Sequence, residues 1–225
     1  SSSKCNKYFC YLPSDIGWEL IDFAPDFDFS LYGESNSDPL NLDTNFEDIE
    51  SSLTSINCKF PSSKYMITLI IPTTVKYIRS NAFSQVDNVS MDLKFEDGIV
   101  LENSAFEACS GLKSIEFFGS VGKIGESCFE GCSNLSKISM IDAEEIGNRA
   151  FLNCLNIKGE LKFSQNTKII GKYSFAFCYG LNGDLKFPDS VVSIGENAFQ
   201  GDLNLNGELV LSKNLKKIER YLFYN

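Results

Sequence analysis

Cysteine thiols are the side chains of this chain whose type and spacing could do chemistry. Four of the eight cysteines, Cys109, Cys132, Cys154 and Cys178, recur at intervals of 22 to 24 residues. Zinc sites use closely spaced cysteines, so these intervals do not resemble one, and the chain has no histidine to complete a mixed site. The regular interval instead predicts a column of buried, reduced thiols, because a free cysteine packs like a small apolar residue.

The lack of histidine also limits catalysis. It removes the Ser-His-Asp and Cys-His arrangements and the commonest general base. Paired carboxylates could hydrolyse a glycosidic bond, but that reaction needs a cleft that gives two acids different environments. The sequence shows no such cleft, and we predict a protein that is not an enzyme, with no catalytic residues, no cofactor and no metal.

A repeated motif sets the cysteine interval. An apolar residue, usually followed by Gly, stands five residues before a Phe in the pairs Ile78/Phe83, Leu101/Phe106, Ile124/Phe129, Ile146/Phe151, Ile170/Phe175, Ile194/Phe199 and Ile218/Phe223. Successive Phe residues are 22 to 24 apart. This interval is typical of leucine-rich-repeat solenoids, in which each coil contacts only its neighbours.

Each coil has the same predicted elements. Residues 112–117 and 181–187 alternate apolar and polar side chains, which indicates half-buried strands. The stretch of the form Gly-x-x-Ala-Phe predicts a short helical or 3₁₀ turn. We therefore expect an α/β solenoid of right-handed coils, with a parallel sheet on one face, short helical or 3₁₀ turns on the other, and an N-terminal cap.

A second recurring position is occupied only by Asn or Gly. It lies five residues after each Phe, at Asn88, Gly111, Asn134, Asn156, Gly180 and Asn204. These residue types enter the left-handed backbone region at low cost, so we predict a positive φ there. Asn88-Val-Ser90 and Asn134-Leu-Ser136 are also N-glycosylation sequons, but backbone geometry already accounts for both asparagines.

The N-terminal quarter differs from the rest. Residues 1–60 hold 11 acidic groups against three lysines, which is −8 of the total charge of −10. We predict an acidic cap or arm over 1–60, and a solenoid of about seven repeats of 22–24 residues over 61–225. Residues 42–56 could form a helix, although 53–58 also fit the strand pattern of the later coils.

Two segments carry a family resemblance. The runs from Gly183 to Phe199 and from Ile124 to Leu135 resemble the BspA-like leucine-rich repeats. The resemblance implies a curved parallel-sheet solenoid without catalytic residues, found in bacteria and in protists. It also implies a cell-surface or secreted adhesin that contacts host cells, matrix proteins or other microbes. The richness in Asn, Lys, Ile and Phe favours a protist source.

The expected sheet face carries two charged columns. One holds Glu160, Asp184 and Glu208, and the adjacent one holds Lys162, Lys186 and Val210, while Asp92 and Lys94 repeat the pair in an earlier coil. Two interpretations stand: a solvated face that keeps the sheet soluble, or a docking face for a protein of complementary charge. Nucleic acid and anionic membrane surfaces are disfavoured as partners, since both need a concentrated basic face, and we predict no nucleic-acid binding. No apolar run is long enough for membrane insertion.

Two functions follow from these features. The first is a surface or secreted adhesion module, with a disulfide between Cys5 and Cys10 and a host surface or extracellular matrix protein as partner. The alternative is an intracellular, cytoplasmic protein-interaction or structural scaffold with reduced thiols. The final residues 221–225 have no polar closing coil, which predicts either a longer parent array or self-association through this end.

Overall fold

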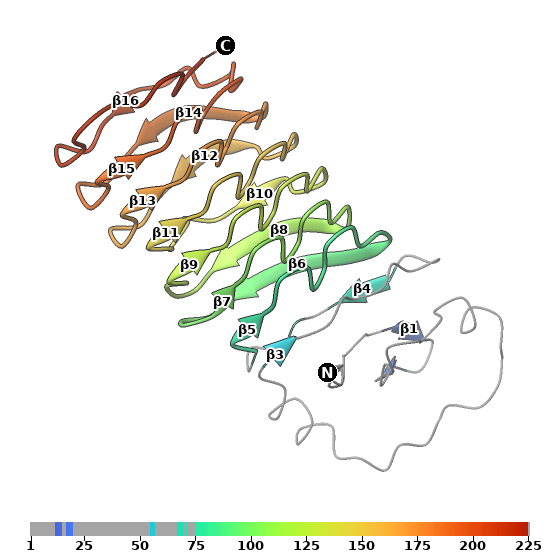
Figure 1. Ribbon diagram of the computed structural model, residues 1–225. Helices are drawn as coiled ribbons and strands as arrows, with labels where there is room; N and C mark the ends of the chain where they lie inside the picture. Colours follow the sequence, from blue (N-terminus) through green and yellow to red (C-terminus); the bar gives the residue numbers. More distant parts are fainter. Residues whose placement is uncertain are drawn as a thin grey trace.

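The computed structural model shows a stack of coils, and it describes residues 12–14, 17–19, 55–56, 67–69, 71 and 75–224 (Figure 1). We number the coils 1 to 7 by the Phe of each motif, from Phe83 to Phe223. The cap or arm expected over residues 1–60 lies mostly outside the described residues. Within it, β1 (Leu12–Ser14) and β2 (Gly17–Glu19) pair antiparallel.

The strands expected on one face are present, but they form two sheets. The four-stranded sheet contains β4 (Ile67–Leu69), β6 (Val89–Phe95), β8 (Leu112–Phe117) and β10 (Lys137–Ile138). The three-stranded sheet contains β12 (Gly159–Lys162), β14 (Leu181–Lys186) and β16 (Leu209–Val210). All these strands pair in parallel, and an isolated bridge between Ile141 and Phe163 links the coils on either side of the gap.

The anchoring Ile and Leu residues form a further parallel sheet. Its seven short strands are β3 (Ser55–Ile56), β5 (Tyr77–Ile78), β7 (Val100–Leu101), β9 (Lys123–Ile124), β11 (Glu145–Ile146), β13 (Ile169–Ile170) and β15 (Ser193–Ile194). Because β3 pairs with β5, the sheet already includes residues 55–56, where the sequence left helix and strand open. Coils 1 to 6 thus contribute strands to two sides of the stack, whereas coil 7 contributes only β16.

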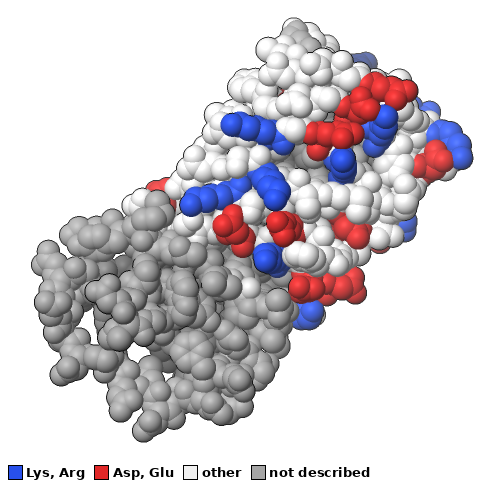
Figure 2. All heavy atoms as spheres, turned by 180° about the vertical axis from the view of Figure 1, so that it is seen from behind, with Lys and Arg blue, Asp and Glu red and all other residues white. Residues whose placement is uncertain are grey.

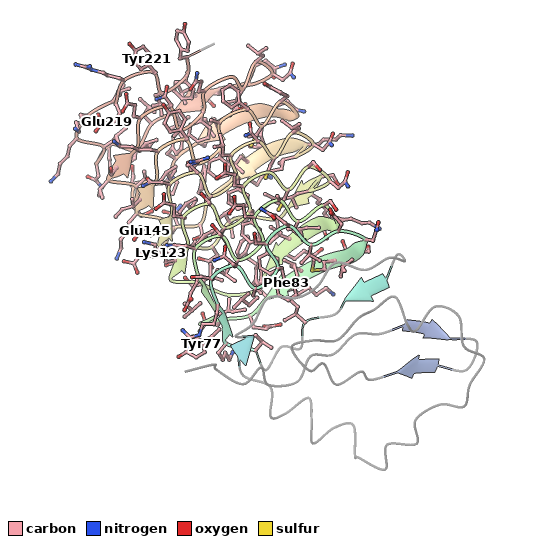
Figure 3. The ribbon with its side chains drawn as sticks, turned by 45° about the vertical axis from the view of Figure 1, so that its right-hand side comes forward. Tyr77, Phe83, Lys123, Glu145, Glu219 and Tyr221 are labelled. Carbon is pink, nitrogen blue, oxygen red and sulfur yellow. The ribbon has the colours of Figure 1, made fainter. Side chains whose placement is uncertain are left out.

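The Phe residues of the motif form the centre of the core. Rings of adjacent coils are stacked, with centroid separations of 4.9 Å for Phe83–Phe106 and 5.1 Å for Phe151–Phe175. The rings of coils 1 to 6 are almost fully buried. Figure 3 shows Phe83 inside the stack, whereas Tyr77, Lys123 and Glu145 lie at its edge. Stacking at nearly the spacing of parallel strands, about 4.8 Å, explains why one aromatic residue recurs in every coil.

The Gly of the Ile-Gly motif allows adjacent coils to approach closely. A Cβ atom at Gly171 would lie 2.5 Å from the backbone carbonyl carbon of Gly147, and one at Gly147 would lie 2.7 Å from that of Gly125. Real Cβ atoms essentially never come this close to backbone. The motif therefore needs glycine for inter-coil packing, although these two residues do not have positive φ.

The turn around each Phe differs from the expected helical or 3₁₀ turn. The described residues contain no helix, and in coils 1 to 6 the backbone instead enters the left-handed region twice, two residues before and two after the Phe. In coil 2 these residues are Ser104 (φ 56°) and Ala108 (φ 52°). A right-handed helix cannot form across alternating left-handed residues, so the stretch becomes a series of tight turns.

These turns bond to one another in a single direction. In coil 2 the N–H groups of Ser104, Phe106 and Ala108 donate to carbonyl groups of coil 3, at 2.6 to 2.8 Å. The carbonyl group of Ala105 accepts the N–H of Phe83 in coil 1. The same pattern recurs along the stack, so in this turn ladder the N–H groups always point towards the next coil. Parallel strands differ, because their N–H and C=O groups alternate in direction.

The recurring Asn or Gly column has a different role from the one predicted. Among its six members only Asn88 has a positive φ, so the prediction is wrong for Gly111, Asn134, Asn156, Gly180 and Asn204. Three of the asparagines bridge coils with their side chains; for example, the Asn134 amide donates to the Ser110 carbonyl at 2.7 Å. The glycines allow close contact instead, since a Cβ at Gly111 would lie 1.5 Å from the Val89 carbonyl oxygen.

Candidate functional site

The structure brings together the charged columns predicted on the later coils. Strands β12, β14 and β16 place Lys162 beside Lys186 and Lys186 beside Val210. The Lys186 ammonium lies 2.6 Å from Asp184 and 3.0 Å from Glu208, and the Lys162 ammonium lies 3.3 Å from Glu160. Five of the seven predicted residues therefore lie on one sheet face, which we call the charged face.

Electrostatics on the charged face are set by these pairs. Hydrogen bonds from Lys186 and from the Glu208 N–H lower the pKa of Asp184. Hydrogen bonds from Lys186 to the carboxylates of Asp184 and Glu208 raise the pKa of Lys186, and the bond to Asp184 has the larger effect. All three side chains are solvent-exposed, so water and salt screen the pairs, which contribute little to stability. The charges are largely matched within the face, because each lysine lies close to at least one carboxylate.

The remaining two predicted residues lie elsewhere. Asp92 and Lys94 belong to β6 in the four-stranded sheet. The Ser114 hydroxyl donates to Asp92 at 2.5 Å, and the Lys94 ammonium lies 6.0 Å from the centre of the exposed Phe118 ring. The sequence pattern placed these residues in equivalent coil positions, but it could not show that the sheet is interrupted between β10 and β12.

Charged pairs also join coils on the seven-stranded sheet. The Lys123 ammonium lies 2.8 Å from Glu145 on the adjacent strand, and both side chains are labelled in Figure 3. Arg79 forms an ion pair with Glu102. Burial alone would raise the pKa of Glu102, but hydrogen bonds from Arg79 and Ser80 outweigh it and lower this pKa. Figure 2 shows basic and acidic side chains interspersed on the face behind Figure 1, without a continuous basic patch.

The thiol column is present and buried. Cys109, Cys132, Cys154 and Cys178 are buried and free, as the sequence predicts. The thiols of the last three donate to the carbonyl group of the Phe in the preceding coil, at 3.0 to 3.2 Å. Burial raises the pKa of Cys109 to about 12 and also raises the pKa values of the other three. Thiolates, which react with oxidants and bind metals, are therefore disfavoured here.

Coil 6 replaces the thiol with a carboxyl group. Asp202 occupies the cysteine position and is only 4% exposed. Its Oδ1 accepts the Cys178 N–H at 2.8 Å, whereas Oδ2 is buried without a hydrogen-bond partner among the described residues. Burial raises the pKa of Asp202 to about 8, although the bond from Cys178 opposes this shift. Cys5, Cys10 and Cys58 lie outside the described residues.

One feature of the turns was not predicted from the sequence. Four residues after the Phe of coils 4, 5 and 6 stand Leu155, Tyr179 and Leu203, which are 42%, 45% and 67% exposed. We call these three residues the turn stripe. The signal was available, because coils 1 to 3 have Asp87, Ser110 and Ser133 at this position.

The last coil exposes side chains whose equivalents are buried. Ile218 is 63% exposed and Phe223 37%, whereas Ile194 and Phe199 are each 1% exposed. Within the part of the chain that the structure describes, no group of three or more His, Cys, Asp or Glu residues could hold a metal ion. The same residues include no helix long and apolar enough to cross a bilayer.

Comparison with known proteins identifies the class. The family model for the BspA type leucine-rich repeat region matches residues 40–158 and 144–225, with six copies. The chain belongs to this family, which is typically non-enzymatic and whose solenoids generally bind proteins. No curated protein shows significant similarity to the chain.

One solved structure supports this fold. The chain is similar to a leucine-rich repeat protein from Bacteroides ovatus, with 26% identity and a TM-score of 0.57; the match covers 67% of this chain and 38% of that one. It therefore spans well under half of that relative. The T. pallidum leucine-rich repeat protein is 24% identical, with a TM-score of 0.48 and coverage of 61% of this chain and 75% of that one.

Proposed function

We propose that this chain is a non-enzymatic adhesion module, on the cell surface or secreted, that binds a host or matrix protein through the charged face. The observation that carries the proposal is the paired charge on β12, β14 and β16, in a family whose solenoids generally bind proteins. A sheet face with ordered charges suits a partner that is steered and oriented by complementary charge.

The alternative is an intracellular protein-interaction or structural scaffold, and the reduced thiols favour it. Five described cysteines are free. However, burial raises the pKa of all five and so disfavours the reactive thiolate in any compartment, and the free thiols therefore weigh little against export. The adhesion proposal also includes residues Asp92 and Lys94 as a second contact on β6.

The test is charge reversal with a matched control. Lys162→Glu combined with Lys186→Glu should weaken binding to immobilised matrix protein, mainly through a slower on-rate and a smaller salt dependence. Lys123→Glu with Lys168→Glu makes the same change in net charge, and both lysines are also ion-paired, but they lie outside the charged face. Equal loss in both double variants, or unchanged binding in the first, would contradict the proposed face.

A further inference from the structure

Two asparagines beside the charged face are each followed by glycine. Asn182 and Gly183 lie in β14, and Asn206 and Gly207 lie just before β16. They form the only two Asn-Gly pairs in the sequence. In both, the Asn stands seven residues after a Phe of the motif, follows a Leu, and is separated by the Gly from an acidic residue. The two sites therefore have nearly the same local sequence, and they differ only in their surroundings.

An Asn-Gly pair can modify itself. The glycine nitrogen attacks the side-chain carbonyl carbon of the asparagine and forms a C–N bond, which closes a five-membered succinimide ring. The bond from that carbon to the side-chain nitrogen breaks, and this nitrogen leaves as ammonia with the proton of the glycine N–H. Water then opens the ring at either carbonyl and gives aspartate or isoaspartate. Glycine permits the reaction because it has no Cβ to block the approach and adopts many backbone conformations.

The backbone around Gly183 has room to reach this geometry. Three residues of β14, 182–184, lie opposite a single residue of β12, so the strand bulges there. The Gly183 N–H donates to the Asn206 side chain at 3.3 Å, a long bond to an exposed group that water can replace. A Cβ atom at Gly183 would lie 3.8 Å from its nearest neighbour, the Glu160 Cβ, which is an ordinary contact.

Gly207 is held by backbone instead. Its N–H donates to the Gly183 carbonyl at 3.0 Å. A Cβ atom at Gly207 would lie 2.6 Å from the Asp184 backbone nitrogen, so this glycine packs directly against β14. The Asn206 side chain is engaged as well, because its Oδ1 accepts the Gly183 N–H. The Gly207 nitrogen therefore cannot approach the Asn206 carbonyl carbon unless the contact between coils opens, and reaction rates depend steeply on such approach.

We propose that Asn182 is a site of spontaneous deamidation and that the fold protects Asn206 from the same reaction. Deamidation replaces a neutral amide with a carboxylate two residues before Asp184, so it adds a negative charge beside the charged face. Isoaspartate also adds one atom to the main chain of β14, at the bulge, where the ladder is already interrupted. The reaction consumes only water, needs no enzyme or oxidant, and does not depend on the proposed function.

Peptide mass spectrometry of the aged protein tests the proposal. The folded protein is incubated at mildly alkaline pH, and the two Asn-Gly peptides are followed over time. Asn182 should deamidate faster than Asn206 by about tenfold or more, because misplacing reacting atoms by about 1 Å can slow a reaction by about 100-fold. In urea the two rates should become similar, since the local sequences match. Intact Asn182, equal rates in the folded protein, or the same ratio of rates in urea would each overturn the proposal.

A matched pair of variants identifies the source of the product. Asn182→Gln keeps the amide but lengthens the side chain, so the ring would need six members and closes less readily. Anion-exchange chromatography should resolve a more acidic species from aged wild type. Asn182→Gln should not form this species, whereas Asn206→Gln should form it at the wild-type rate or faster. Asn182 is exposed, so an unchanged melting temperature would confirm that its variant is folded. Equal formation of the acidic species in Asn182→Gln would place deamidation at another asparagine and overturn the proposal.

Discussion

Replacing Asp202 tests whether a buried carboxyl group with one unpaired oxygen destabilises the solenoid. The change Asp202→Asn keeps an oxygen to accept the Cys178 N–H and removes the ionisable group. Asp202→Cys restores the residue found in coils 2 to 5 and can donate to a Phe carbonyl, as three of those thiols do. Cys178 is the only titratable side chain in the described structure that interacts with Asp202. Both variants should therefore stabilise the protein at neutral pH.

The magnitude follows from the raised pKa. The pKa of Asp202 rises from 3.8 to about 8 through burial, so the folded state holds a proton that the unfolded state releases between these values. Stability then falls as pH rises through this window, by about 1.4 kcal/mol per pH unit, and levels off above pH 8. At pH 7 the loss is at most about 4 kcal/mol relative to an unperturbed carboxyl. Local opening of coils 6 and 7 would make this loss of stability smaller, because Asp202 could then ionise without global unfolding.

Urea denaturation at pH 5, 6, 7 and 8 measures this effect. The wild type should lose stability steadily across the series, and the two variants should lose markedly less. Carboxyls with lowered pKa values, such as Asp184 and Asp189, destabilise the protein only as pH falls below about 5, outside this window. Asp184→Asn is therefore the control, and it should retain the wild-type slope. Parallel pH profiles for wild type and Asp202→Asn would refute the reasoning.

Two further predictions concern the packing between coils. Gly171→Ala should destabilise the protein by about 1 to 3 kcal/mol in urea denaturation, because the new Cβ would meet backbone of the preceding coil; Gly122→Ala, with no atom within 4 Å, is the control and should have little effect. Equal effects at the two glycines would show that close approach is not the reason for the motif. Cys109, Cys132, Cys154 and Cys178 should resist a thiol reagent in the native state and react after unfolding, as followed by mass spectrometry of labelled peptides. Native-state labelling of any of these four would contradict their burial.

The sequence predicted features that repeat with packing and missed features that depend on backbone conformation. The Phe and Cys columns were confirmed because each must fill the same space in every coil. The turns were not predicted well, because their left-handed positions fall at residues such as Arg149 and Tyr173, which carry no compositional signal for positive φ. The Asn column was predicted to have positive φ, but only Asn88 does, and the amides of Asn134, Asn156 and Asn204 bridge coils instead.

Some features of the candidate surfaces were predicted from the sequence, and others were not. Alternation along the strands correctly placed Asp184, Lys186 and Glu208 together, since outward residues of parallel strands share a column. It could not show that Asp92 and Lys94 lie in a separate sheet. The turn stripe was not predicted, because single exposed apolar residues are ordinary on protein surfaces. Tyr179 is unusual only in comparison with the equivalent positions of the other coils.

The turn ladder also gives the solenoid a net dipole along its axis. Each peptide group carries a dipole of about 3.5 D. The ladder aligns three such groups per coil, with every N–H pointing towards coil 7 and every C=O towards coil 1. Their dipoles add along the stack, with the positive pole at the coil 7 end, whereas an α-helix has its positive pole at its N-terminus. Repetition of this coil therefore builds a long dipole without a helix.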